Sequence, residues 1–168
     1  MKLSRSSILF AIVAVVLLSS LPGAIRRLAQ TGDPYLFTKQ FFEDLAARLT
    51  GAGKFRFIVQ PTVAVILGVR YGIKDVHANR PPFLTMLALH ASHRGHALRT
   101  ALADVRDLVA IAILLDILSQ WLIFREIHPA AAIILGPVLI TVPYSLAREL
   151  ANRIARARRP RATAARSV

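Results

Sequence analysis

Residues Pro129–Ala147 form a run of 19 without a charged side chain, and this run constrains the fold of the chain more than any other feature. In a helix, about 20 apolar residues cross the roughly 30 Å hydrocarbon core of a bilayer. Pro137 and Pro143 would disrupt a helix in water, but in a membrane neighbouring helices satisfy the backbone groups that a proline frees. The sequence therefore predicts a transmembrane helix over 129–147.

A second apolar run, at 8–25, follows Lys2 and Arg5 near the N-terminus. A cleaved signal peptide would show the same basic start and apolar middle. Cleavage after Ala24, however, would place Pro22 where a small residue other than proline is wanted. We therefore favour an uncleaved transmembrane anchor over a signal peptide.

Two more runs, at 55–73 and 108–124, complete the set of predicted spans. The later one ends in Trp121 and Phe124, as is typical of the membrane interface. The run at 55–73 contains Arg56 and Arg70, so it spans if both guanidinium groups reach the headgroups, and is otherwise a re-entrant segment. The four runs together predict an all-α polytopic membrane helix bundle with about four transmembrane helices.

The chain is both apolar and basic. Of its 168 residues, 55% are hydrophobic and 18% are charged, with a formal net charge of +13. Soluble domains carry about 25% charged residues, so this composition disfavours both a disordered basic chain and a typical soluble enzyme. The sequence has no cysteine, which excludes disulfides, thiolate metal sites and cysteine nucleophiles.

The C-terminal segment 148–168 holds seven arginines against one glutamate. Because basic segments beside a span stay in the cytoplasm, we predict cytoplasmic N- and C-termini, and the even number of crossings that this requires favours four spans. If 55–73 is re-entrant instead, three spans remain and the N-terminus faces out. We expect one membrane domain over 1–157 and a basic, disordered tail over 158–168.

The same basic residues are expected to contact anionic phospholipid headgroups. The predicted lipid-binding residues are Arg148, Arg153, Arg156, Arg158, Arg159 and Arg161. No nucleic acid is expected as a partner, because the tail has no aromatic side chain on which bases could stack.

Two stretches outside the spans, 34–50 and 83–107, have the pattern of amphipathic helices. In the first, Asp33 is the expected N-cap, and Arg48 falls on the polar face, paired with Asp44 four residues earlier. The second is expected to form two short surface helices joined by a turn. Such helices either pack on the rest of the chain or dock a partner protein.

Asp116 is the most informative polar residue, because a carboxylate inside a predicted span is costly and suggests a function. Gln120 lies one turn later on the same face, and Gln60 in the 55–73 run is its expected structural partner. These three intramembrane polar residues form either a clasp between helices or a proton or ion site. We favour the clasp, because a relay usually needs several ionisable groups across the membrane.

His90, His93 and His96 recur every three residues and are the only candidate metal ligands that the spacing offers. The established helical motif instead places two histidines four apart with a glutamate. We therefore expect solvated or headgroup-contacting histidines and no metal or other cofactor.

Sequence motifs of nucleophile elbows, phosphate loops, zinc proteases and dinucleotide sites are all missing, so an enzyme is not supported. The sequence favours a non-enzymatic membrane subunit or accessory protein that acts through helix–helix and anionic-lipid contacts, with a protein partner or a second copy of itself. The alternative is an oligomeric transporter or channel, including a holin-like one, with Asp116 as its proton or ion site.

Several segments resemble a pattern in small uncharacterised bacterial integral membrane proteins. They are 55–61, 68–70, Lys74–Asp75, 79–83 and Pro143–Tyr144, together with Asp116 and Gln120. The resemblance covers roughly 54–156. It implies a multi-pass protein of the bacterial inner (plasma) membrane and no particular activity.

Overall fold

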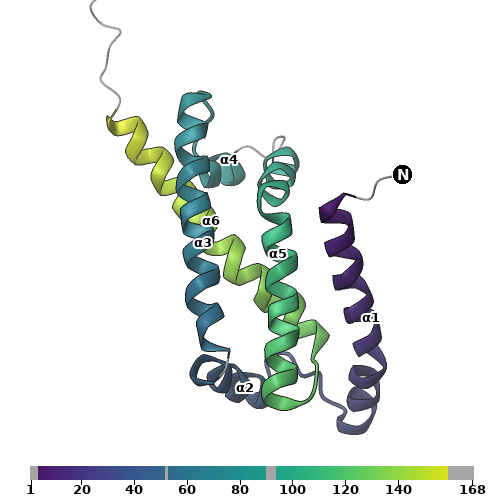
Figure 1. Ribbon diagram of the computed structural model, residues 1–168. Coiled ribbons are helices and arrows are strands. Elements are labelled where there is room, and N and C mark those ends of the chain that lie inside the picture. Colours follow the sequence, from purple (N-terminus) through teal and green to yellow (C-terminus); the bar gives the residue numbers. More distant parts are fainter. Residues whose placement is uncertain (1–3, 52, 90–93, 159–168) are drawn as a thin grey trace, which may run out of the picture. The chain divides into compact units, whose positions relative to one another are not determined.

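The structure is a computed structural model that describes residues 4–51, 53–89 and 94–158. Within these residues the chain is all-helical, which confirms the predicted fold class (Figure 1). The six helices are α1 (Arg5–Thr31), α2 (Lys39–Thr50), α3 (Lys54–His77), α4 (Phe83–Leu89), α5 (Arg94–Phe124) and α6 (Pro129–Arg158).

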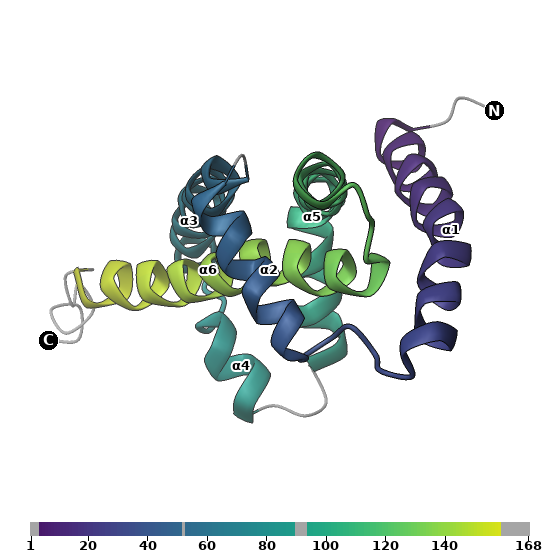
Figure 2. The ribbon, with the colours of Figure 1, turned by 90° about the horizontal axis from the view of Figure 1, so that it is seen from below.

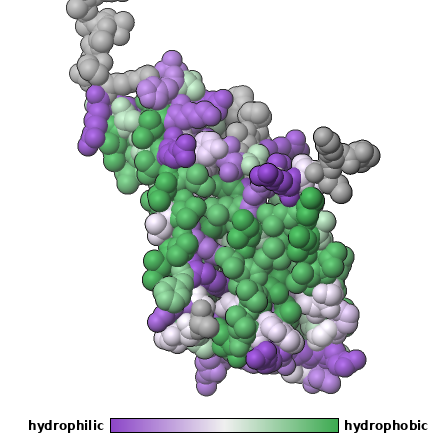
Figure 3. Space-filling model, viewed as in Figure 1, coloured by the Kyte–Doolittle hydropathy of each residue, from purple (hydrophilic) through white to green (hydrophobic). Residues whose placement is uncertain are grey.

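Four helices are long and apolar enough to cross a membrane: α1, α3, the Ala103–Phe124 part of α5, and α6. Large apolar side chains on all four are exposed, among them Leu18, Ile58, Leu118 and Leu146. Figure 3 shows broad apolar surface on the face of the molecule that it presents. Soluble proteins rarely expose apolar area on this scale, so the chain has the surface of a possible multi-span membrane protein.

The chain divides into two compact units. Unit 1 consists of Met1–Pro61 and Val105–Thr141, and unit 2 consists of Thr62–Asp104 and Val142–Val168. The three boundaries between the units fall inside α3, α5 and α6.

Unit 1 packs α1, α5 and the first part of α6 through small and branched apolar residues. Its core consists of Val13, Ala110, Ile113, Ile117 and Ala132. Gly136 lies so close to α5 that a Cβ there would be 2.9 Å from the backbone nitrogen of Ile113. Small residues therefore let α5 and α6 approach closely, as is common between membrane helices.

Helix α2 begins later than the sequence pattern suggested. Its N-cap is Thr38, whose hydroxyl accepts a hydrogen bond from the Phe41 backbone N–H, and not Asp33. Phe37, at a φ of 63°, turns the chain immediately before this cap. Helix α2 lies at the end where α3 begins and α5 ends (Figure 1), and seen from below it leaves the end of α5 uncovered (Figure 2).

Unit 2 pairs α3 and α6 through glycines spaced four apart. A Cβ on Gly68 would lie 2.5 Å from the Tyr144 carbonyl oxygen, and one on Gly72 would lie 2.9 Å from the Ala151 Cβ. The Gly68-x-x-x-Gly72 spacing places both residues on one helix face, where the missing side chains allow backbone contact.

The 83–107 stretch differs from the prediction in its second half. Helix α4 forms as a short helix, but α5 starts at Arg94 and continues without interruption to Phe124. No glycine or proline lies between Gly95 and Phe124, so nothing in the sequence ends the helix before the predicted span at 108. The second predicted surface helix is thus the first part of α5.

Candidate functional site

Asp116 lies fully buried in unit 1, on α5, between two arginines from other helices. Its Oδ1 is 3.4 Å from Nη1 of Arg48 on α2 and makes a closer ion pair with Nη2 of Arg56 on α3. Gln120, one turn along α5, donates from Nε2 to Oδ2 at 2.6 Å. Two buried guanidinium groups therefore share one buried carboxylate, which leaves one positive charge in excess.

Arg48 is not on a solvated face, and its predicted pairing with Asp44 is wrong. The side chain is buried, donates to the Tyr35 hydroxyl at 3.2 Å, and lies 5.5 Å over the Phe124 ring. Asp44 instead accepts the Tyr35 hydroxyl proton at 2.7 Å. The reason is Asp116, because a buried carboxylate without a countercharge is far more costly than a buried arginine that has one.

Gln60 is buried in α3, as expected of an intramembrane polar residue, but Asp116 is not its partner. Neither atom of its side-chain amide has a hydrogen-bond partner in the described part of the chain. Arg48 and Arg56 occupy Oδ1 of Asp116, and the Gln120 amide occupies Oδ2. The sequence therefore indicated the right carboxylate and the wrong partner.

Gln120 also fixes the turn between α5 and α6. Its Oε1 accepts the backbone N–H of His128 at 2.6 Å. The His128 ring stacks on Tyr35 at 3.6 Å between ring centroids, and Nη1 of Arg27 lies 2.8 Å from its Nε2. The network thus closes on itself, from Asp116 through Gln120, His128 and Tyr35 to Arg48.

Both rings in this network stay neutral near pH 7. Burial, reinforced by the charge of Arg27, lowers the pKa of His128 to about 4. Burial and the hydrogen bond to Asp44 raise the pKa of Tyr35 above its usual value. A neutral His128 accepts the N–H of Arg27, so the ring acts as a hydrogen-bond acceptor and not as a cation.

A cavity of about 300 Å³ lies beside this network, between α3 and α5. Its polar walls are Arg56, Gln60 and Ser119. Apolar side chains surround them: Phe55, Val59, Leu115, Leu118 and Leu122.

Unit 2 has its own buried charge cluster, centred on Arg148 of α6. Its Nε and Nη2 donate to the two oxygens of Asp75 at 2.6 and 3.0 Å, and Nη1 donates to the Tyr144 hydroxyl at 2.8 Å. Asp104 lies 3.4 Å from Nη1. The prediction that Arg148 contacts lipid headgroups is therefore wrong, because its hydrogen-bonding groups face protein carboxylates.

The other predicted lipid-binding residues lie beyond this cluster. Arg153 donates to Glu149 at 2.7 Å, and Arg156 donates to Asn152 at 2.7 Å. Arg158 is exposed at the end of α6. Arg159 and Arg161 lie outside the described residues, as do His90 and His93, and of His96 only the helical backbone is described.

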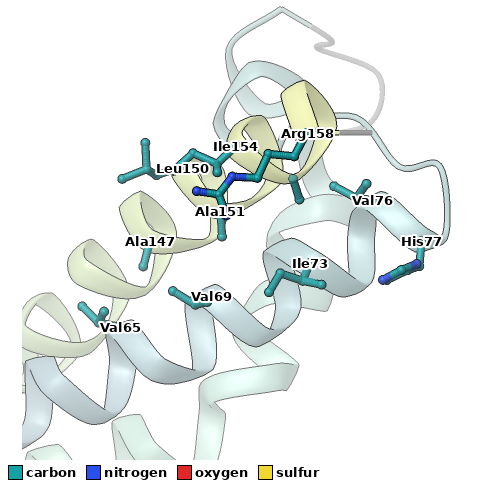
Figure 4. Close-up of a pocket in the computed structure, with 11 residues that line it drawn as sticks. Val65, Val69, Ile73, Val76, His77, Ala147, Leu150, Ala151, Ile154 and Arg158 are labelled. Carbon is teal, nitrogen blue, oxygen red and sulfur yellow. The ribbon is translucent and has the colours of Figure 1, made fainter. Parts of the chain in front are cut away.

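Unit 2 also has an apolar groove between α3 and α6, of about 680 Å³ (Figure 4). Its walls include Val65, Val69 and Ile73 of α3, and Leu150 and Ile154 of α6. His77 lies at one end, and the Arg158 side chain extends from the end of α6 back toward Ala151. The groove therefore combines a long apolar wall with two basic side chains.

The chemistry of these sites is that of charge pairing. In residues 4–51, 53–89 and 94–158, no group of three or more metal-ligating side chains converges. Comparison of the chain with protein-family models, curated proteins and solved structures finds no match.

Proposed function

We propose that this chain is a non-enzymatic subunit or accessory protein of a bacterial inner membrane, acting through helix–helix and anionic-lipid contacts. The observation that carries the proposal is the buried Arg48–Asp116–Arg56 cluster. It neutralises Asp116, which lies well inside the Ala103–Phe124 span, with side chains from two other helices. A clasp of this kind holds helices in fixed positions, which is what a membrane scaffold requires.

The same cluster argues against Asp116 as a proton-carrying site. Protonation of the carboxylate would leave two buried guanidinium groups without a countercharge, which is strongly unfavourable. A transporter or channel with Asp116 as its ion site would have to bear this cost in each cycle. The cluster therefore supports a clasp between helices more strongly than it supports a transporter or channel.

Lipid contact is supported by the groove in unit 2. An acyl chain laid along Val69 and Ile154 would bring a phosphate toward Arg158 and His77. The arginine-rich end of the chain then lies at the cytoplasmic surface, where anionic lipids attract it. This orientation also follows from the excess of basic residues in 148–168.

Purification in a mild detergent, followed by reconstitution, tests the function. We expect proteoliposomes with the wild-type protein to conduct protons and small ions no faster than protein-free vesicles. Flux that Asp116→Asn abolishes, in a variant that still inserts and purifies normally, would contradict the proposal and favour the transporter or channel.

Reporter fusions test the orientation. Truncated chains fused after Ala52, Asp104, Glu126 and Val168 should report outside, inside, outside and inside in that order. A cytoplasmic signal after Ala52 would be incompatible with four crossings and cytoplasmic termini.

A further inference from the structure

The cavity between α3 and α5 in unit 1 is lined by polar side chains that the protein itself leaves unused. Arg56, Gln60 and Ser119 are 7%, 4% and 6% exposed. The Nε and Nη1 of Arg56, both amide atoms of Gln60 and the Oγ of Ser119 have no hydrogen-bond partner in the described residues. Buried polar groups are normally paired, and three such side chains on one cavity wall are a specific exception.

The chemistry of these groups selects the ligand. Arg56 offers N–H donors, Gln60 an NH₂ group, and Ser119 a hydroxyl that can donate. Only Oε1 of Gln60 must accept. A ligand that satisfies the wall is therefore rich in acceptor oxygens.

The charge of the site selects an anion. Arg48 and Arg56 both pair with Asp116, so one positive charge remains unbalanced. Asp44 does not balance it, because it reaches Arg48 only through the Tyr35 hydroxyl and is partly exposed. His128 is neutral near pH 7. A phosphate or carboxylate group can thus pair with the free edge of Arg56.

The rim of the cavity adds an apolar requirement. Phe55 and Val59, at 67% and 55% exposed, border it on α3, and Leu118 and Leu122 are exposed on α5. A free anion would gain nothing from these side chains. An alkyl chain could lie against these apolar side chains in place of water or lipid without a cost in free energy.

We propose that this cavity binds the anionic head group of an amphiphile, with its alkyl chain lying along the exposed side chains of α3 and α5. Arg56 pairs with the anion, and Gln60 and Ser119 donate hydrogen bonds to its oxygens. The site deepens the proposed function by naming a binding site for an anionic amphiphile, and it rests on that function in that these helices lie in a membrane.

Binding of dodecyl phosphate to the purified full-length chain in dodecyl maltoside, counted by native mass spectrometry, tests the proposal. We expect one saturable site. The double variant Gln60→Leu/Ser119→Ala should weaken binding about tenfold or more, because two hydrogen bonds to a charged group are lost. The matched control, Gln30→Leu/Ser19→Ala on α1, should bind as the wild type does.

The double variant should fold, because Gln60 and Ser119 make no hydrogen bonds that the fold needs. If it does not purify, Ser119→Ala alone is expected to weaken binding by about threefold or more. Binding that is equal in the wild type and the variant would overturn the proposal, as would no saturable binding at all. If inorganic phosphate binds as tightly as dodecyl phosphate, the site binds a free anion. If dodecyltrimethylammonium binds as tightly, the site recognises only the alkyl chain. Either result would overturn the proposal.

These outcomes are separate from those of the proposed function. A chain that conducts no ions but fails to bind dodecyl phosphate would lose the amphiphile site and keep the scaffold function. A chain that conducts ions and binds dodecyl phosphate would keep the amphiphile site and lose the scaffold function.

Discussion

Replacing Asp116 with asparagine removes the charge of the carboxylate while keeping its shape. The buried guanidinium groups of Arg48 and Arg56 then face each other without a countercharge. At the 3.4 Å between Arg48 Nη1 and Asp116 Oδ1, a unit-charge pair attracts by about 5 kcal/mol at an effective dielectric constant of about 20. Breaking one buried pair by removing a partner costs about 3–5 kcal/mol. Because Asp116→Asn breaks two, we expect a loss at the upper end, about 5 kcal/mol.

The two-to-one ratio of charges makes the effects of the other substitutions unequal. Arg56→Met leaves Arg48 and Asp116 as a neutral pair and removes a guanidinium with unsatisfied N–H groups, so we expect a change of about 1 kcal/mol or less. In Asp116→Asn/Arg56→Met only one guanidinium lacks a partner. This double variant should therefore be about 2 kcal/mol more stable than Asp116→Asn.

Unfolding in mixed micelles of dodecyl maltoside with increasing dodecyl sulfate, followed by helical circular dichroism, measures these differences. The double-mutant cycle isolates the coupling of Asp116 with Arg56. If Asp116→Asn is as stable as the wild type, or if adding Arg56→Met to it restores nothing, the reasoning from charge pairing is refuted.

Three further predictions concern other contacts, each measured by the same unfolding assay. Lowering the pH from 7.5 to 5 should destabilise the chain by about 2 kcal/mol through His128. The pKa of His128 is about 4 in the folded chain and about 6.5 in the unfolded chain. The contribution of His128 to stability is therefore fully present above pH 6.5 and is lost as the pH falls toward 4. In His128→Gln this loss should disappear; a loss of unchanged size would contradict the assignment. Gly72→Ala should cost about 2 kcal/mol or more, because the added Cβ forces α3 away from α6. The control Gly23→Ala should be neutral or stabilising, because nothing lies within 4 Å of the added Cβ. Equal effects of the two substitutions on stability would count against close packing of α3 and α6. Asp75→Asn should cost about 3 kcal/mol by leaving Arg148 without its bidentate partner, and a neutral result would mean that this pair does not hold unit 2 together.

The helices were predictable because their signal is local. The apolar length of each run determines whether it can span a membrane, and all four predicted runs lie in helices that could do so. The continuation of α6 past Ala147 to Arg158 also follows from the local sequence, since no glycine or proline interrupts it. The close contact at Gly68 and Gly72 was not predicted, although the four-residue spacing of these glycines is a local signal for it.

The partners of the buried charges were not predictable in the same way. Arg48 is polar, and helical periodicity placed it opposite the apolar face of α2. Its burial depends on a carboxylate 68 residues later in the chain, which no pattern within α2 records. Arg148 was assigned to the basic tail because arginines follow it, yet Asp75 and Asp104, from two other helices, surround it. The partners of a buried charge depend on the tertiary structure and not on the local sequence.

Ribosomes complete Arg48 and Arg56 before Asp116, because both arginines precede the carboxylate along the chain. In a chain that inserts into a bilayer during synthesis, the countercharges of α5 would already exist, and α5 would not carry a bare anion through hydrocarbon. A fragment that begins after Arg56 would lack this advantage and would meet an insertion cost of about 2.5–3.5 kcal/mol for the carboxylate. The order of the residues would thus help a nascent chain to enter a membrane, before any clasp has formed.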